Sequence, residues 1–309
     1  MNFDCIIFDG LNMMVMSEHS KKYQLMQNSS GQPTGVIYGV LKTLLNSLKR
    51  WRCKNIYFVY DSGVDTYKKQ LDESYKQGRT SNYSQIMAST PEATEQKIEF
   101  LRQKDVLIKI LNETLAIRTL TIPEVEADNV IGCLSSFYNK SLIYSGDSDF
   151  ISLHNETTCW VFNSRKKEFR STKDFGVIGP CYAVCKSIVG DPTDSIKGLK
   201  GVGWKTVIKW LNTECPFDID DLKNLCLSRN DKLGNKILEN FNEVEKNFKL
   251  IKLDCTAGQY FHLQLLEKVK DLVSNPPKYD YVKFLDYVKK EGFEMMEFYD
   301  LVNYVKLSS

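Results

Sequence analysis

Short β-rich runs that alternate with helical patterns constrain the fold of this 309-residue chain more than any other feature. The runs occupy residues 3–8, 55–60, 116–120, 142–144 and 158–162. Between the first two, apolar residues recur at helical spacing and predict a helix from about Gly35 to Trp51. A strand, a helix and a second strand in this order form a parallel pair with the helix as the crossover. We therefore predict an α/β fold with a mostly parallel central sheet flanked by helices.

The pattern changes twice along the chain. Polar residues dominate near the middle of the first part, so we expect an exposed, partly helical excursion over about 64–94. An amphipathic helix is expected after it, over 92–115. In the second part of the chain the β signals fade and helical patterns prevail. We predict an α/β core over 1–178 and a smaller helical lobe over 179–309.

Acidic residues follow three of the expected strands. Asp9 and Asp61 come directly after the first two, and Asp147 and Asp149 follow the strand over 142–144. Two more, Glu126 and Asp128, lie where a fourth strand leads into a helix, a place where the helix dipole favours acids. Ligands bind at the carboxyl edge of an open α/β sheet. We expect these side chains, which are far apart in sequence, to meet at that edge.

A group of carboxylates needs bound cations to be stable. Two like charges about 4 Å apart repel by roughly 4 kcal/mol at an effective dielectric constant near 20. Oxygen ligands without His or Cys select hard ions such as Mg²⁺ or Mn²⁺, and the nine cysteines contain no Cys-x-x-Cys pair that would bind zinc. A pair of such ions suits the hydrolysis of a phosphodiester. The strand-end acids therefore predict a two-metal centre for this reaction.

Five motifs resemble the flap endonuclease family, which includes the 5′ nuclease domain of DNA polymerase I and free-standing phage enzymes. They are Asp9-Gly10-Leu11-Asn12, Tyr75-Lys76-Gln77-Gly78-Arg79, Glu126-Ala127-Asp128, Ser145-Gly146-Asp147-Ser148-Asp149-Phe150 and Gly190-Asp191-Pro192-Thr193-Asp194-Ser195-Ile196-Lys197-Gly198. The resemblance runs to about Asp254. It implies that the metal ligands, direct or through water, are Asp9, Asp61, Glu126, Asp128, Asp147, Asp149, Asp191 and Asp194.

The same resemblance assigns the excursion as a helical arch that a 5′ single strand passes. Lys76 and Arg79 match the catalytic basic pair of the family, and Tyr75 matches an aromatic residue that can stack on a base. For Lys68 and Lys69 we expect a solvated basic loop with at most weak phosphate contacts. A Lys and an Arg above the scissile phosphate would offset the negative charge that develops there.

The segment over 191–213 resembles the helix-three-turn-helix with which the family grips duplex DNA and often holds a K⁺ ion. Gly201 and Gly203 allow the backbone to approach a phosphate, and a helix start follows with free N–H groups. No acid lies between Ser195 and Thr213. The lysines that we expect to contact the duplex are Lys197, Lys200, Lys205 and Lys209. Such contacts position DNA without reading its sequence.

One position departs from the family pattern. The family commonly has another acid after Glu-Ala-Asp, and Asn129 stands there, so a metal-binding charge is missing. A DNA-junction binding protein with weakened catalysis is therefore one alternative. A phosphatase of the haloacid dehalogenase type is another, since Asp9 follows a similar strand, but that chemistry needs an acid at the position of Leu11.

The resemblance implies a structure-specific 5′ nuclease, acting as a 5′-3′ exonuclease and flap endonuclease in DNA replication or repair. Its partners would be branched or 5′-flapped DNA, RNA–DNA hybrid in RNase H-like primer removal, and a single-strand-binding protein or sliding clamp. With 41 basic and 39 acidic side chains, net charge alone gives no case for a nucleic acid. No apolar run is long enough to cross a membrane, and the N-terminus lacks signal-peptide features, so we expect a cytoplasmic protein. We also expect it to be a monomer.

Overall fold

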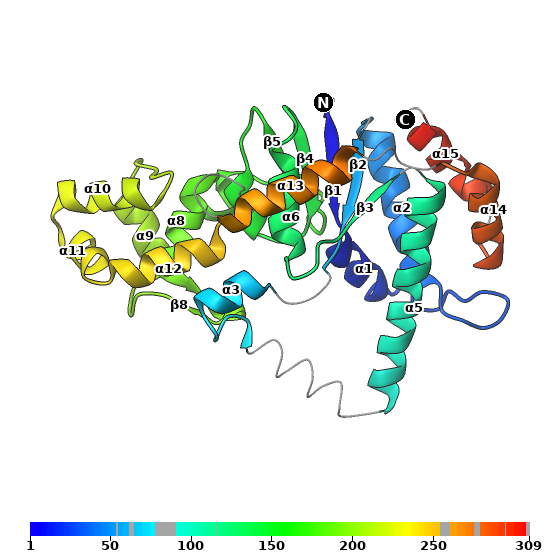
Figure 1. Cartoon of the computed structure of the whole chain (residues 1–309), viewed down its shortest axis with the longest axis horizontal. Coiled ribbons are helices and arrows are strands. Elements are labelled where there is room, and N and C mark those ends of the chain that lie inside the picture. The colour runs from blue at the N-terminus through cyan, green and yellow to red at the C-terminus, as the bar shows by residue number, and fades with distance from the viewer. Residues whose placement is uncertain are drawn as a thin grey trace.

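The computed structural model describes residues 1–53, 55–61, 65–77, 91–115, 117–253, 260–274, 279–293 and 295–306. Figure 1 shows the sheet near the centre of the molecule, with a helical lobe on one side and the last two helices of the chain on the other. Among the described residues, no helix is long and apolar enough to cross a membrane.

A six-stranded sheet forms the centre of the fold, with the order β3-β2-β1-β4-β5-β6. The strands are β1 (Cys5–Asp9), β2 (Asn55–Val59), β3 (Arg118–Leu120), β4 (Ser141–Ser145), β5 (Cys159–Asn163) and β6 (Glu168–Phe169). The first five pair in parallel, and β6 pairs antiparallel at the edge. Phe8 of β1 lies between Phe58 of β2 and Tyr144 of β4, so the three strands end at one level. The predicted mostly parallel sheet is confirmed.

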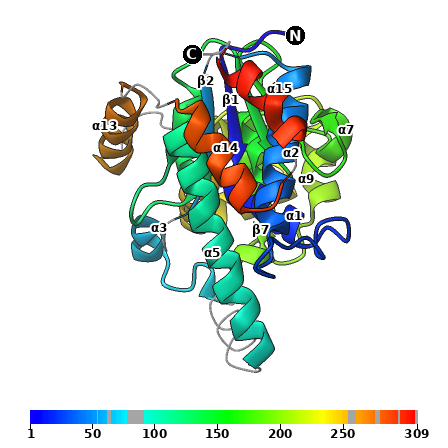
Figure 2. The same ribbon diagram turned by 90° about the vertical axis from the view of Figure 1, so that its right-hand side faces the viewer.

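Helices cover both faces of the sheet because each presents an apolar stripe to it. The first helices are α1 (Gly10–Glu18), α2 (Gly35–Arg50), α3 (Thr66–Leu71), α5 (Pro91–Thr114) and α6 (Ala127–Ser135). Figures 1 and 2 show α2 and α5 grouped on one side of the strands with the C-terminal helices α14 (Tyr281–Lys290) and α15 (Met295–Lys306). The remaining C-terminal helix, α13 (Tyr260–Ser274), packs against α6.

A second apolar core builds the helical lobe. The short helix η1 (Asp149–Leu153) follows the sheet and contacts both cores. The elements of the lobe are α7 (Thr172–Phe175), α8 (Pro180–Val189), β7 (Gly190–Asp191), η2 (Pro192–Asp194), β8 (Ile196–Lys197), α9 (Trp204–Leu211), α10 (Ile219–Arg229), α11 (Lys232–Glu239) and α12 (Phe241–Ile251). The lobe that we predicted from the sequence extends over 179–309. Val269 of α13, Phe284 of α14 and Phe298 of α15 belong to the core around the sheet. The last three helices therefore return to the α/β core.

Candidate metal centre

The carboxyl edge of the sheet brings Asp9 and Asp147 together. Asp9 ends β1 and accepts hydrogen bonds from the backbone N–H of Asn12 at 3.1 Å and from the Ser145 hydroxyl at 2.6 Å. Ser145 ends β4, and its Oγ also accepts from the backbone N–H of Asp147 at 3.0 Å. Because β1 and β4 are neighbours, one serine hydroxyl links the carboxylate of Asp9 to the backbone of Asp147.

The start of α6 adds three more acids to this edge. Asp61, two residues beyond the end of β2, accepts a hydrogen bond from the backbone N–H of Ala127 at 2.7 Å. Glu126 and Asp128 stand on either side of Ala127, so all three carboxylates gather at the N-terminus of α6. The exposed N–H groups and dipole of that helix end favour negative charge.

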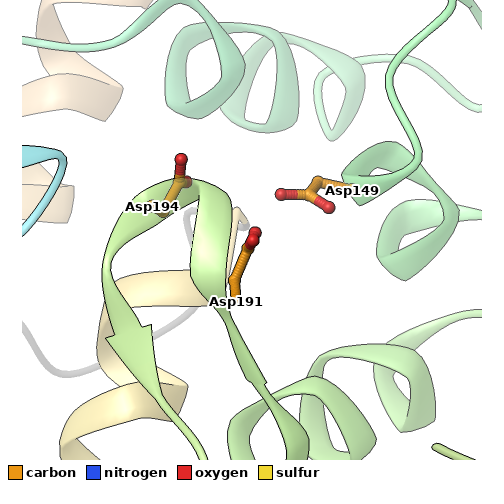
Figure 3. A group of neighbouring side chains, drawn as sticks. All are labelled: Asp149, Asp191 and Asp194. Atoms are coloured by element: carbon orange, nitrogen blue, oxygen red, sulfur yellow. The ribbon is translucent and has the colours of Figure 1, made fainter. Parts of the chain in front are cut away.

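A second acidic group joins the sheet edge to the helical lobe. Oxygens of Asp149, Asp191 and Asp194 lie within 4.8 Å of one another. Asp149 starts η1 after β4, whereas Asp191 and Asp194 flank the short η2 turn, and Figure 3 shows Asp149 facing that turn from a separate element. Lys186 of α8 contacts Asp149 at 2.5 Å and Asp191 at 2.6 Å. An ammonium group thus lies among these carboxylates, where a positive charge is needed.

Burial and crowding change the charge states of these acids. Burial, with the charges of Asp147 and Asp61, raises the pKa of Asp9 to about 7. Burial also raises the pKa of Asp128 and of Asp61 above the usual range for aspartate. Carboxylates that are hard to ionise in the metal-free protein are typical of a site that is completed by a cation.

Two lysines from the base of the excursion pair with Glu126. Lys76 Nζ lies 2.5 Å from Glu126 Oε1, and Lys68 Nζ lies 2.9 Å from Glu126 Oε2. Although burial acts in the opposite direction, these ammonium groups lower the pKa of Glu126 to about 2. Lys68 is 3% exposed, so the expectation of a solvated loop lysine was wrong at this position.

The backbone at Lys76 ties the excursion to the helical lobe. Its N–H donates to the carbonyl oxygen of Asp194 at 2.8 Å, and its φ of +53° is unusual for a residue other than glycine. Lys76 Nζ also lies 3.9 Å from Asp194 Oδ2. The predicted catalytic lysine therefore touches acids of both groups.

Tyr75 is placed differently from what base stacking requires. Its side chain is 2% exposed, and its hydroxyl donates to Glu126 Oε2 at 3.0 Å. In this conformation the ring packs in the lobe core and offers no open face to a base. Arg79, the other expected catalytic cation, lies outside the described residues.

The expected duplex-binding segment presents an open, basic surface. Its four lysines are exposed, and these are Lys197, Lys200, Lys205 and Lys209. Gly201 has a φ of +74°, and no atom would lie within 4 Å of a Cβ at Gly201 or Gly203. Gly203 also caps the start of α9, whose first N–H groups are available there. The segment is thus accessible to a phosphate backbone, and its DNA contacts stay a prediction.

Two residues that sequence reasoning missed lie in the candidate centre or directly beside it. Lys186 lies in the apolar helix α8, where no local pattern distinguishes it from a surface lysine. Asp65 is 0% exposed and caps α3 through the backbone N–H of Lys68. Its position just before a helical run was a readable N-cap signal, although nothing local indicated its burial.

The donor set fits divalent cations. Every acidic ligand is an oxygen donor, and the carboxylates come from the sheet edge, the start of α6 and the lobe. Protein ammonium groups already balance part of this charge. An open α/β sheet with such an edge defines a metal-dependent hydrolase of the phosphodiester-cleaving class.

Comparison with known proteins narrows this class. The profile of the 5′-3′ exonuclease N-terminal resolvase-like domain matches residues 4–177. The 5′-3′ exonuclease of Buchnera aphidicola is 30% identical over 273 residues, which are 82% of this chain and 88% of that relative. DNA polymerase I of Thermus thermophilus is 28% identical over 244 residues, 74% of this chain and 26% of the polymerase. Among solved structures, the bacteriophage T5 flap endonuclease, in a complex with DNA and metal ions, has a TM-score of 0.68 at 17% identity. That match covers 89% of this chain and 100% of the phage chain and supports the shared fold.

This chain belongs to the 5′-3′ exonuclease family and is a nuclease. The resemblance drawn from its motifs is thereby confirmed.

Proposed function

We propose that this nuclease cleaves DNA phosphodiesters beside a free 5′ end in branched or flapped duplexes, using two Mg²⁺ or Mn²⁺ ions. The observation that carries the proposal is the meeting of Asp149 from the sheet edge with Asp191 and Asp194 from the lobe, close to a lysine of the excursion. Solved T5 5′-exonuclease structures of this fold contain divalent ions, which supports the same use here.

Two groups of side chains would hold the ions. Asp149, Asp191 and Asp194 form one group, and the other consists of Asp9, Asp61, Glu126, Asp128 and Asp147. When bound, the ions supply Lewis-acid chemistry that activates water and stabilises the leaving oxygen. The Ser145 hydroxyl keeps Asp9 and Asp147 in register, and the α6 N-terminus orients Asp61.

The basic residues would place the substrate. Lys76 is suited to offset charge at the scissile phosphate, because its ammonium already lies between Glu126 and Asp194. We assign the same role to Arg79 from its motif. The open lysines of α9 and the turn before it would track duplex phosphates, with a K⁺ ion at the turn, so recognition would depend on DNA shape.

The wider role is proposed from the family. Removal of 5′ flaps and of RNA in RNA–DNA hybrids during replication or repair suits a cytoplasmic monomeric enzyme. Docking to a single-strand-binding protein or a sliding clamp would bring it to such substrates.

Cleavage of a labelled 5′-flap oligonucleotide tests the proposal. Wild-type protein should cut it with Mg²⁺ and leave it whole in EDTA, whereas Asp147→Asn should lose roughly a thousandfold or more in rate. Asp286→Asn, a change at an exposed site on α14, is the matched control and should cut normally. A shifted but uncut substrate would instead indicate a junction-binding protein, and release of terminal phosphate alone a phosphatase.

A further inference from the structure

A buried carboxylate that the metal centre does not use lies beside it. Asp65 is 0% exposed and caps α3, where its Oδ1 accepts from the backbone N–H of Lys68 at 2.9 Å. Its Oδ2 accepts from the side-chain amide of Asn129 at 2.9 Å and lies 3.5 Å from the backbone N of Glu126. Asp65 therefore contacts the residues on both sides of the Ala127-Asp128 pair.

Asn129 has the chemistry that this carboxylate requires. A buried carboxylate must be hydrogen-bonded, and the amide of Asn129, which is 4% exposed, provides a donor. An aspartate at position 129 would place two acceptor-only carboxylates in contact. The family commonly has an acid at position 129. In this chain Asn129 stands there, and the acid is instead its hydrogen-bond partner Asp65, at the N-cap of α3.

Asp65 is also connected to the acids through Lys68. Although burial lowers it, the charges of Asp128, Glu126 and Asp65 together raise the pKa of Lys68 well above its ordinary value. Lys68 Nζ lies 2.9 Å from Glu126 and 3.9 Å from Asp128.

We propose that Asp65 is a positioning residue, which with Asn129 holds the start of α6 so that Glu126 and Asp128 can bind divalent ions. Asp65, at the N-cap of α3, carries the negative charge that position 129 lacks. This inference rests on the proposed metal centre, but its test needs no DNA.

Capping of α3 alone is the simpler role, and the two roles separate by substitution. Asparagine caps a helix about as well as aspartate, so Asp65→Asn keeps the cap and removes the charge. In the Asp65→Asn variant, the side-chain amide of residue 65 faces the side-chain amide of Asn129 in place of a carboxylate. The exchange Asp65→Asn with Asn129→Asp restores a carboxylate facing an amide, with the direction of the bond reversed.

The experiment measures Mn²⁺ affinity by calorimetry and thermal stability in EDTA for wild type, both single variants and the exchange. Asp65→Asn should weaken Mn²⁺ binding roughly tenfold, as is typical for a residue that orients a ligand. Asn129→Asp should lower the Tm in EDTA, and the exchange should return affinity to within about threefold of wild type. Asp280→Asn is the matched control, because Asp280 caps α14 in the same way and lies on another element.

Several results would overturn the proposal. Wild-type Mn²⁺ affinity in Asp65→Asn would leave only the capping role, as would an exchange that recovers stability without affinity. If Asp65→Asn does not fold, a folded, metal-binding exchange supports the pair, and an exchange that also fails to fold overturns it. A wild-type protein that binds Mn²⁺ but does not cleave DNA would count against the proposed function. The comparison of Mn²⁺ affinity between wild type and Asp65→Asn would still test the role of Asp65.

Discussion

At the residue scale, ionisation of the strand-end acids is unfavourable until a cation binds. Asp9 shows this most directly, because burial and neighbouring charges raise its pKa from 3.8 to about 7. A carboxylate with a raised folded-state pKa stabilises the fold only while it is protonated, so its contribution is lost as the pH rises from about 4 to about 7. Above that range the metal-free protein carries a strained charge at this position.

Replacing this acid should therefore stabilise the metal-free protein. We expect Asp9→Asn to raise the free energy of unfolding in EDTA by up to about 4 kcal/mol at pH 8, because the unfavourable charge is removed while both hydrogen-bond partners can be kept. The gain should vanish near pH 4. Urea unfolding at the two pH values measures it, with Asp286→Asn as the control. An equal change at both pH values would contradict this explanation.

Lys186 should have the opposite effect. Its ammonium contacts Asp149 and Asp191, so Lys186→Met leaves crowded carboxylates without that cation. We expect the metal-free protein to lose about 2 to 4 kcal/mol of stability, as when one partner of a buried ion pair is removed. Mg²⁺ should restore more stability than it does in wild type, since no ammonium competes. Thermal unfolding with EDTA and with Mg²⁺ tests this, and Lys173→Met, at an exposed lysine, should change neither value.

Some of these residues could be read from the sequence and others could not. Asp9 and Asp147 are predictable because a strand end fixes where a side chain lies in a parallel sheet. Lys68 and Tyr75 are not, because their burial depends on α3 folding against α6 and the lobe. Local polarity suggested a solvated loop, whereas an ion pair of Lys68 and a hydrogen bond from Tyr75, both to Glu126, allow these polar groups to be buried.

At the element scale, regular elements of the first part follow their apolar periodicity closely. The helix predicted from about Gly35 to Trp51 ends at Arg50, and its buried side chains recur at helical spacing. The C-terminal helices show the limit of such reasoning. An apolar stripe predicts that a helix packs against the rest of the protein, but it does not identify the partner. Helix α15 packs on α2, although the two helices lie at opposite ends of the chain.

Helix α9 should contribute binding strength rather than chemistry. Lys205 and Lys209 are exposed on it, and no acidic residue lies between Ser195 and Thr213, so they can contact phosphates. We expect Lys205→Ala with Lys209→Ala to weaken duplex binding and to reduce the slope of log affinity against log salt by about 2. Fluorescence anisotropy over a salt series gives the slope. The exposed pair Lys268 and Lys270 of α13 is the control, and an unchanged slope in the α9 variant would exclude the contact.

At the scale of the whole molecule, the candidate metal centre takes its acids from two cores. Asp9, Asp147 and Asp149 come from the edge of the sheet, whose core includes β1 and β4, whereas Asp191 and Asp194 come from the lobe. The excursion meets both, since Lys76 pairs with Glu126 and with Asp194. Bound cations would thus hold together parts of the chain that fold around separate apolar clusters.

Divalent metal should therefore act as a cross-link. At a hundredfold excess over its dissociation constant, Mg²⁺ should stabilise the fold by about 2.7 kcal/mol, which for a chain of this size raises the Tm by roughly 5 to 10 °C. Hydrogen exchange should slow chiefly at η2, β8 and η1, because these segments carry or adjoin Asp149, Asp191 and Asp194. Asp191→Asn should remove most of this local protection while leaving that of β1 and α2 unchanged. Uniform protection across both cores, or an unchanged response in Asp191→Asn, would mean that the ions do not bridge the lobe to the sheet.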